Sequence, residues 1–261
     1  MKKVGAMLAM GIVLLGMLAG FKNMENRKIF TTPPPVSPSA STTHSKVITI
    51  EAAHELACSN LYDSLKLAAA GLSKEAFRYA WFGFQKAGFA KPILAIADFS
   101  QSSRQKRLYV IDFKNQKVLL NTYVAHGRNS GQEYASKFSN TNSSYQSSLG
   151  FYRGLGTYQG KHGLSLRLQG LEKNINDQAF ERAIVMHGAD YVSEDFIRQT
   201  GRLGRSLGCP AVSQAEHQQL IKLLRDGAGL FLYYPDAHYL SKSKILQQAV
   251  AANYNVAVSN S

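Results

Sequence analysis

The chain has 261 residues, and 30 Lys and Arg side chains against 17 Asp and Glu give it a formal net charge of +13. Hydrophobic residues make up 45% of the sequence, which excludes a disordered basic tail and suits one domain with a full core. The two cysteines, Cys58 and Cys209, are too few for a disulfide framework, and their spacing matches no metal motif.

Residues 1–21 have the layout of an export segment. Two lysines precede eighteen uncharged residues, 4–21, as in the n-region and h-region of a signal peptide. Eighteen apolar residues also just span a bilayer, so a retained anchor stays open as the alternative to a cleaved signal. We therefore expect export to the periplasm or cell envelope, with membrane association through this segment if it is retained.

Residues 22–46 are the predicted linker. Within 31–45 lie four of the seven prolines, together with Ser and Thr and no Asp, Glu, Lys or Arg, a composition typical of extended chain. Outside the cytoplasm, the net positive charge would meet anionic envelope polymers and lipid headgroups. Because no cluster of basic residues is interleaved with aromatics, we do not expect nucleic acid as a partner.

Residues 47–92 are the predicted helical segment. Apolar residues recur at spacings of three and four over 51–70, and Gly71 is placed to end that helix. Ser73 is placed to cap a second helix, which ends before Gly88. Cys58 falls on the apolar face of the first helix, so we expect it to be a small buried hydrophobe rather than a ligand or nucleophile.

Residues 93–240 are the predicted catalytic domain, followed by a C-terminal tail, 241–261. Three β-rich runs, 93–99, 107–113 and 117–125, come first, with 114–116 as the turn of a hairpin. Shorter strand-like pieces follow at Phe151, 164–168, 183–186 and 230–234. Strands and helices do not alternate, so the sequence predicts an α+β fold with a mainly antiparallel β-sandwich or barrel and the N-terminal helical pair.

The stretch from residue 126 to residue 148 is rich in Gly, Ser and Asn. It is too long for an idle connection in a compact domain. We expect it to be a binding loop, in particular a mobile lid over the cleft.

The residues best suited to catalysis lie between positions 184 and 212. A short apolar run leads to His187, and a helix capped by Ser193 and ended by Gly201 follows. The chain then returns to Cys209, which a glycine precedes and a proline follows, so the thiol lies in a tight, accessible turn.

Such a turn can activate a thiol. The backbone N–H groups of Gly208 and Cys209 can stabilise a developing oxyanion. A thiolate nucleophile needs a base or imidazolium partner, and His187 is the histidine whose strand could supply it. We therefore expect a Cys209 that favours the thiolate and is not bonded to Cys58, although a structural cysteine stays the alternative on residue types alone.

These residues resemble the L,D-transpeptidase (YkuD-type) catalytic domain, in which a histidine precedes a Ser/Thr-x-Gly-Cys motif. The segments HGADYV, GRLGRSLGCPAV, GKHGLSLRLQGLE and SSLGFY are similar to a variant branch, the murein L,D-transpeptidase catalytic domains, over about residues 93–235. The resemblance implies a β-rich sandwich or barrel, a Cys209 nucleophile and a His187 base. It also implies that Ser206 supports the histidine or the oxyanion site, and that peptidoglycan stem peptides are the substrate.

The sequence departs from the usual pattern in three places. Eighteen residues separate His187 from Ser206, Leu207 replaces a common histidine, and a Pro-Ala pair follows Cys209 where an Ile-Arg pair is usual. The resemblance suggests that the missing arginine binds a substrate carboxylate. We transfer that role to Arg205 or Arg202.

Three further residues are candidates for substrate contact. His162 and His126 each precede glycine in loop-like surroundings, so either could line the cleft or be an ordinary surface histidine. Tyr191 lies four residues after His187 and could cover the peptide or pack in the core. We expect His217 to be solvated.

The resemblance implies a thioester acyl-enzyme on tetrapeptide stems, used in wall cross-linking or remodelling, with no cofactor and no metal. Three alternatives stay open: an L,D-carboxypeptidase with the same site, a zinc wall peptidase, and a non-catalytic peptidoglycan-binding module. The zinc enzyme would draw its ligands from His126, His162, His187 and Cys209. We expect a monomer.

Overall fold

The computed structural model describes residues 50–247. The predicted export segment (1–21), the predicted linker (22–46) and residues 248–261 of the predicted tail lie outside this range. The described residues belong to one compact unit. Over this range, no helix has both the length and the apolar character that crossing a membrane requires.

Three helices open the described chain: α1 (Ile50–Ser64), α2 (Leu67–Ala70) and α3 (Lys74–Lys86). The sequence predicts one helix over 51–70, but Lys66 adopts a left-handed backbone with φ of 53° and divides it. Ser73 caps α3 as predicted, because its side chain accepts a hydrogen bond from the backbone N–H of Ala76 at 3.1 Å.

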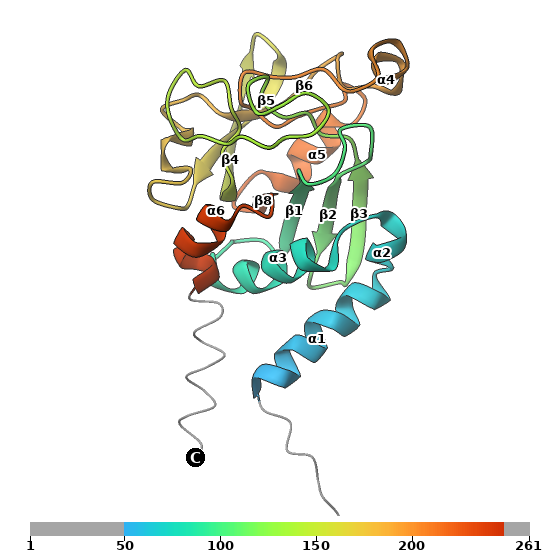
Figure 1. Ribbon diagram of the computed structural model, residues 1–261, viewed down its shortest axis with the longest axis vertical. Helices are drawn as coiled ribbons and strands as arrows, with labels where there is room; N and C mark the ends of the chain where they lie inside the picture. Colours follow the sequence, from blue (N-terminus) through green and yellow to red (C-terminus); the bar gives the residue numbers. More distant parts are fainter. Residues whose placement is uncertain (1–49, 248–261) are drawn as a thin grey trace, which may run out of the picture. The chain divides into compact units, whose positions relative to one another are not determined.

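Eight strands form one sheet: β1 (Ile93–Asp98), β2 (Leu108–Asp112), β3 (Lys117–Thr122), β4 (Gly150–Gly160), β5 (Gly163–Gly170), β6 (Val185–Gly188), β7 (Ala211–Val212) and β8 (Gly229–Tyr233). Their order is β3-β2-β1-β8-β4-β5-β6-β7 (Figure 1). The pairs β1–β8 and β6–β7 are parallel, and the other neighbouring pairs are antiparallel. The predicted α+β fold with a mainly antiparallel sheet is confirmed.

The sheet bends until its two edges approach each other. Ala125, three residues beyond β3, forms an antiparallel bridge with Ala211 of β7, at the opposite end of the strand order. Two backbone hydrogen bonds, of 2.8 and 3.4 Å, join these two residues. The sheet is therefore a near-barrel.

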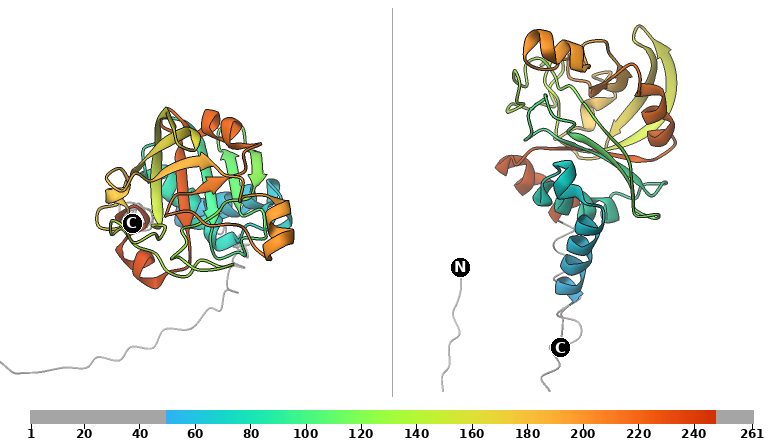
Figure 2. Two further views of the ribbon diagram at one scale, coloured as in Figure 1. Left: turned by 90° about the horizontal axis from the view of Figure 1, so that it is seen from above. Right: turned by 90° about the vertical axis from the view of Figure 1, so that its right-hand side faces the viewer.

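Both faces of strands β1, β2 and β8 are buried, which explains their nearly continuous apolar runs. Leu94 and Ile96 of β1 pack in one cluster with residues of α1 and α3, on the side where Figure 2 shows these helices. Ala95 and Ala97 face the other cluster, which contains residues of β5, β6 and α5 (His217–Leu224).

Helix α3 lies unusually close to the sheet at Gly83. A Cβ atom at this position would lie 2.0 Å from Cζ of Phe151 in β4. Only glycine therefore allows this packing, which joins the helical segment to the central strands. The remaining elements are η1 (Asp177–Ala179), α4 (Glu194–Thr200) and α6 (Ala237–Lys242).

Candidate active site

Strand β6 places His187 at the centre of the site. His187 pairs with Ser165 of β5 on one side and Ala211 of β7 on the other, and it is 3% exposed. Its Nδ1 lies 2.9 Å from the carbonyl oxygen of Gly188. Because a carbonyl oxygen only accepts, Nδ1 carries the proton of the neutral ring, and Nε2 is the basic nitrogen.

Cys209 lies in a turn that Ser206 braces. The Ser206 Oγ accepts a hydrogen bond from the N–H of Gly208 at 3.0 Å and donates one to the carbonyl oxygen of Cys209 at 2.6 Å. Gly208 has φ of +126°, a left-handed conformation that favours glycine. The serine thus supports the turn, and it makes no hydrogen bond with His187 in the described structure.

This brace changes the predicted oxyanion site. Because Ser206 already accepts from the Gly208 N–H, the prediction of a free Gly208 donor is wrong. The N–H of Cys209 donates to no other described residue. It is the turn's candidate donor to an oxyanion.

The Cys209 sulfur is half-buried against β6. Its Sγ accepts a hydrogen bond from the N–H of Val185 at 3.5 Å and lies 3.8 Å from the carbonyl oxygen of Ala183. Burial raises the pKa of the thiol, opposed by the Val185 N–H and the positive charge of Arg182. The expectation that the free protein favours the Cys209 thiolate is therefore wrong.

Both proposed reacting groups open into one cavity of about 620 Å³. Its lining includes Cys209, His187, Ser206, His162, Tyr191 and Arg205, all predicted from the sequence, together with Lys161, Arg182 and Leu207. No hydrogen bond joins His187 to Cys209 in the described structure. The lining contains three basic side chains, Lys161, Arg182 and Arg205, and no Asp or Glu. The cavity therefore favours an anionic ligand.

A second histidine covers the first. His162, in the turn between β4 and β5, stacks on His187 with ring centroids 4.4 Å apart and an interplanar angle of 20°. Burial lowers the pKa of His187, the Gly188 carbonyl opposes this effect, and the charge of His162 adds to it. His187 is therefore a neutral base at pH 7.

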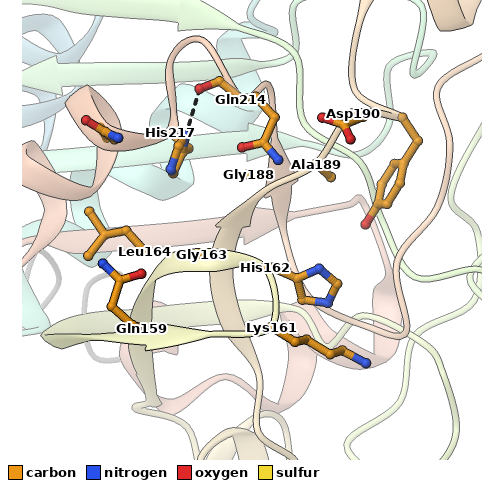
Figure 3. Close-up of a pocket in the computed structure, with 12 residues that line it drawn as sticks. Gln159, Lys161, His162, Gly163, Leu164, Gly188, Ala189, Asp190, Gln214 and His217 are labelled. Atoms are coloured by element: carbon orange, nitrogen blue, oxygen red, sulfur yellow. Dashed lines mark hydrogen bonds between the residues drawn. The ribbon is translucent and has the colours of Figure 1, made fainter.

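A second cavity, of about 690 Å³, shares Lys161, His162 and Tyr191 with the first. Figure 3 shows His162 and Lys161 at the tip of the β4–β5 hairpin, with Gln214 and His217 among the residues across the pocket. His217 is 8% exposed, and its Nδ1 donates to the Gln214 carbonyl at 2.7 Å. The prediction of a solvated His217 is wrong.

His126 lies beneath the site rather than in it. It is 1% exposed and lines neither of these two cavities. Its Nδ1 accepts a hydrogen bond from the fully buried Arg107 at 2.7 Å, and burial together with this positive charge lowers the pKa of His126 to about 3. The predicted substrate contact through His126 is wrong, because the side chain is sealed in the core. Its carbonyl oxygen instead accepts from the N–H of Ser206 at 3.0 Å.

Only one of the two candidate arginines lines the Cys209 cavity. Arg205 does, and its Nη1 donates to the carbonyl oxygens of Arg128 at 3.0 Å and Gly131 at 2.9 Å. Arg202 does not; its Nη1 donates to the carbonyl oxygen of Leu203. The predicted carboxylate contact through Arg202 therefore has no support in the geometry.

The segment 126–148 supports the turn that carries Cys209. The N–H of Arg128 donates to the carbonyl oxygen of Ser206 at 2.8 Å, and the Ser147 Oγ donates to that of Gly208 at 3.1 Å. No residue of the segment lines the Cys209 cavity. The predicted lid over the cleft is wrong, because polar groups of the segment are hydrogen-bonded to the backbone of the Cys209 turn and none of its residues lines the cavity.

Comparison with protein families identifies the domain. A family model described as the L,D-transpeptidase catalytic domain matches residues 68–233. The chain belongs to the L,D-transpeptidase catalytic domain family. No curated protein matches the chain.

Solved L,D-transpeptidase structures are distantly similar. The chain is 13% identical to an L,D-transpeptidase from Mycobacterium smegmatis, covering 55% of this chain and 59% of that one, with a TM-score of 0.35. For an L,D-transpeptidase from Stackebrandtia nassauensis the values are 18% identity, 62% and 67% coverage, and a TM-score of 0.32. The chain thus spans about 59% of the length of the mycobacterial enzyme.

Two basic residues on the lining of the Cys209 cavity, Arg182 and Lys161, were not predicted from the sequence of this L,D-transpeptidase family member. Arg182 lies five residues before His187, and its proximity to Cys209 depends on how the chain enters β6. Lys161 lies in the GKHG turn, and the short connection between two strand-like runs was the sequence signal that could have indicated its position. For the zinc-peptidase alternative, residues 50–247 contain no group of three or more His, Cys, Asp or Glu side chains arranged to hold a metal ion.

Proposed function

We propose that the protein is a cysteine-dependent L,D-transpeptidase that acts on peptidoglycan tetrapeptide stems. The observation that supports this proposal is that Cys209 and His187 line one cavity, whose lining contains Lys and Arg side chains but no Asp or Glu. Stem peptides end in carboxylates, which such a cavity attracts. Arg205 and Lys161 are the groups available to bind them.

In the proposed reaction, Nε2 of His187 takes the proton of the Cys209 thiol as the sulfur attacks the carbonyl carbon before the terminal D-Ala. The N–H of Cys209 donates to the oxyanion. The C–N bond then breaks, and the leaving D-Ala amine receives the proton from His187. A thioester at Cys209 remains.

The second half of the reaction reverses these steps. An amine of another stem attacks the thioester carbon, loses its proton to His187 and forms the cross-link, and the sulfur leaves as the thiol. His187 and Cys209 are not hydrogen-bonded in the free protein, and catalytic hydrogen bonds often shorten only in the substrate complex. Bound substrate is therefore expected to bring Nε2 and Sγ together.

The test is incubation of purified protein with a disaccharide-tetrapeptide, followed by mass spectrometry. A cross-linked dimer supports transpeptidation, whereas tripeptide alone indicates the carboxypeptidase. Cys209→Ala should abolish product and the acyl adduct, and Cys58→Ala, the matched control, should leave turnover near normal. An adduct that persists in Cys209→Ala would show that another residue is the nucleophile.

Location in the cell envelope belongs to the same proposal. The layout of residues 1–21 favours export, and stem peptides lie outside the cytoplasm. Cell fractionation of the full chain, compared with a chain that lacks residues 1–21, tests it. Equal amounts of both chains in the cytoplasm would contradict export.

A further inference from the structure

We propose that Arg182 is a positioning residue for Cys209, holding the supporting loop in place and setting a positive charge beside the thiol. The proposal rests on the proposed function only in assigning Cys209 as the nucleophile. In this chain a Pro-Ala pair follows Cys209, so no arginine comes directly after the cysteine in the sequence. Arg182 comes from a different part of the chain, the approach to β6.

The guanidinium of Arg182 makes four hydrogen bonds to one loop. Nη1 donates to the carbonyl oxygen of Ser139 at 2.8 Å and to the Oγ of Ser148 at 2.5 Å. Nη2 donates to the carbonyl oxygen of Gln146 at 2.7 Å and to the Oγ of Ser144 at 3.2 Å. A planar fork with fixed donors suits this task, which the single ammonium of lysine cannot reproduce.

The loop that Arg182 holds is the loop that supports the catalytic turn. Ser147, between two of the arginine's partners, donates from Oγ to the carbonyl oxygen of Gly208 and accepts from the N–H of Gly127. Gly208 also lies directly beside the arginine, since a Cβ atom on it would be 3.4 Å from Nη2 of Arg182. The hydrogen bonds therefore link the guanidinium to the backbone immediately before Cys209.

The same guanidinium has no carboxylate to neutralise it. Arg182 forms no ion pair with any described Asp or Glu, and it lines the cavity into which Cys209 opens. Its positive charge stabilises a Cys209 thiolate. The titratable and charged groups around that thiol are Arg182, Lys161, His162, His187, Tyr158, Tyr191 and Arg205.

The test measures the thiol rather than turnover. Cys209 is alkylated with iodoacetamide over about pH 6 to 11, and peptide mapping follows the Cys209 peptide. Arg182→Gln removes the charge, so we expect its alkylation midpoint to move up by about one pH unit. Arg182→Lys keeps the charge, so its midpoint should stay near that of the wild type. In both variants, hydrogen exchange over 139–148 should be faster than in the wild type, because the fork is lost.

Arg153 supplies the matched control. It is half-buried, and its guanidinium also donates to backbone carbonyl oxygens, those of Ala87 and Gly88, but it does not line the cavity. Arg153→Gln should leave the Cys209 midpoint and the exchange of 139–148 unchanged. If Arg182→Gln kept the wild-type midpoint, the proposed effect of the arginine's charge on Cys209 would be wrong. If exchange over 139–148 were unchanged in both Arg182 variants, the proposed support of the loop would be wrong.

A measurement on the wild type covers the case in which the variants do not fold. A cation beside the sulfur favours an anionic reagent, so the ratio of iodoacetate to iodoacetamide rates at Cys209 should exceed that of N-acetylcysteine and fall in high salt. An equal ratio would overturn the proposal. These measurements use the free thiol and do not depend on turnover. Failure of the proposed function would be seen separately, as activity that persists in Cys209→Ala.

Discussion

The stacked pair of histidines determines how the site should respond to acid. In the proposed reaction His187 must be neutral to accept the thiol proton, and burial lowers its pKa from the ordinary 6.5. Activity should therefore be constant near neutral pH and fall only below pH 6.5, as His187 becomes protonated. His162→Gln removes a neighbouring charge, so the pKa of His187 should rise and the fall should begin at higher pH.

This prediction is checked by the pH profile of kcat/KM in both proteins. His187→Ala is the reference, and it should lose about a hundredfold to ten-thousandfold in rate while keeping its fold. His162→Gln should retain turnover at neutral pH. If His187→Ala were fully active and His162→Gln inactive, the base would be His162.

Cys58 should make the fold sensitive to alkali. The side chain is 4% exposed, and burial, with the negative charge of Glu55 adding to it, raises the pKa of the thiol from 9.0 to about 12. Above about pH 9 the unfolded chain loses a proton that the folded chain keeps, so the free energy of unfolding falls as the pH rises toward 12. Cys58→Ala should make this fall less steep.

Urea denaturation at about pH 8, 9 and 10 measures that slope. The slopes are compared rather than the absolute stabilities, because removing a buried side chain lowers stability at every pH. Several buried tyrosines also have raised pKa values, so the slope should decrease without vanishing. Identical slopes in both proteins would show that Cys58 ionises normally in the folded state.

Among the elements, those with local signals are the ones that the sequence predicts. Strands β1, β2 and β3 differ from the predicted runs by at most three residues at an end. Burial on both faces makes β1 and β2 nearly continuously apolar, whereas β3 is only partly buried and was recognised with the hairpin turn that precedes it. Strand β4 spans eleven residues, yet only Phe151 was recognised, since four of the eleven are glycine. The parallel pairing of β1 with β8 joins strands more than a hundred residues apart, and no local pattern specifies it.

The residues of the candidate site also differ in how far the sequence predicts them. Cys209 and His187 were singled out because a histidine followed by a Ser-x-Gly-Cys motif resembles a known family, whereas residue types alone left a structural cysteine open. Their catalytic roles stay a prediction. Buried His126 is hydrogen-bonded to Arg107, just before β2 and 19 residues away, and the place of Arg182 depends on a loop 34 to 43 residues away. Such long-range contacts are fixed by packing, which residue spacing does not encode.

The segment 126–148 should behave as a support in solution. The N–H of Asn129 donates to the carbonyl oxygen of Tyr145, and that of Ser139 to Ser147, both at 3.0 Å. Hydrogen exchange at these amides should therefore be slow in the free protein and change little when substrate or an acylating inhibitor is added. Fast exchange that becomes slow on acylation would restore the lid interpretation.

At the scale of the whole molecule, the helical segment and the sheet share one core. Leu61 and Tyr62 of α1 belong to the same buried cluster as residues of β1, β2, β4 and β8. The Tyr62 hydroxyl also donates to the carbonyl oxygen of Leu72 at 2.6 Å. The family match begins at residue 68, so α1 lies outside it but packs against the matched domain. We therefore expect α1 and the sheet to unfold in one transition.

Leu61→Ala tests this shared core. Leu61 is 7% exposed, so the substitution should cost about 2–4 kcal/mol and lower the Tm by about 5–15 °C. Leu56→Ala is the matched control in the same helix, because Leu56 is 52% exposed and its loss should change the Tm little. Melting is followed by far-UV and near-UV circular dichroism. Coincident curves at a lower temperature are expected for Leu61→Ala, whereas an early helical transition with an unchanged near-UV curve would show that α1 is a separate unit.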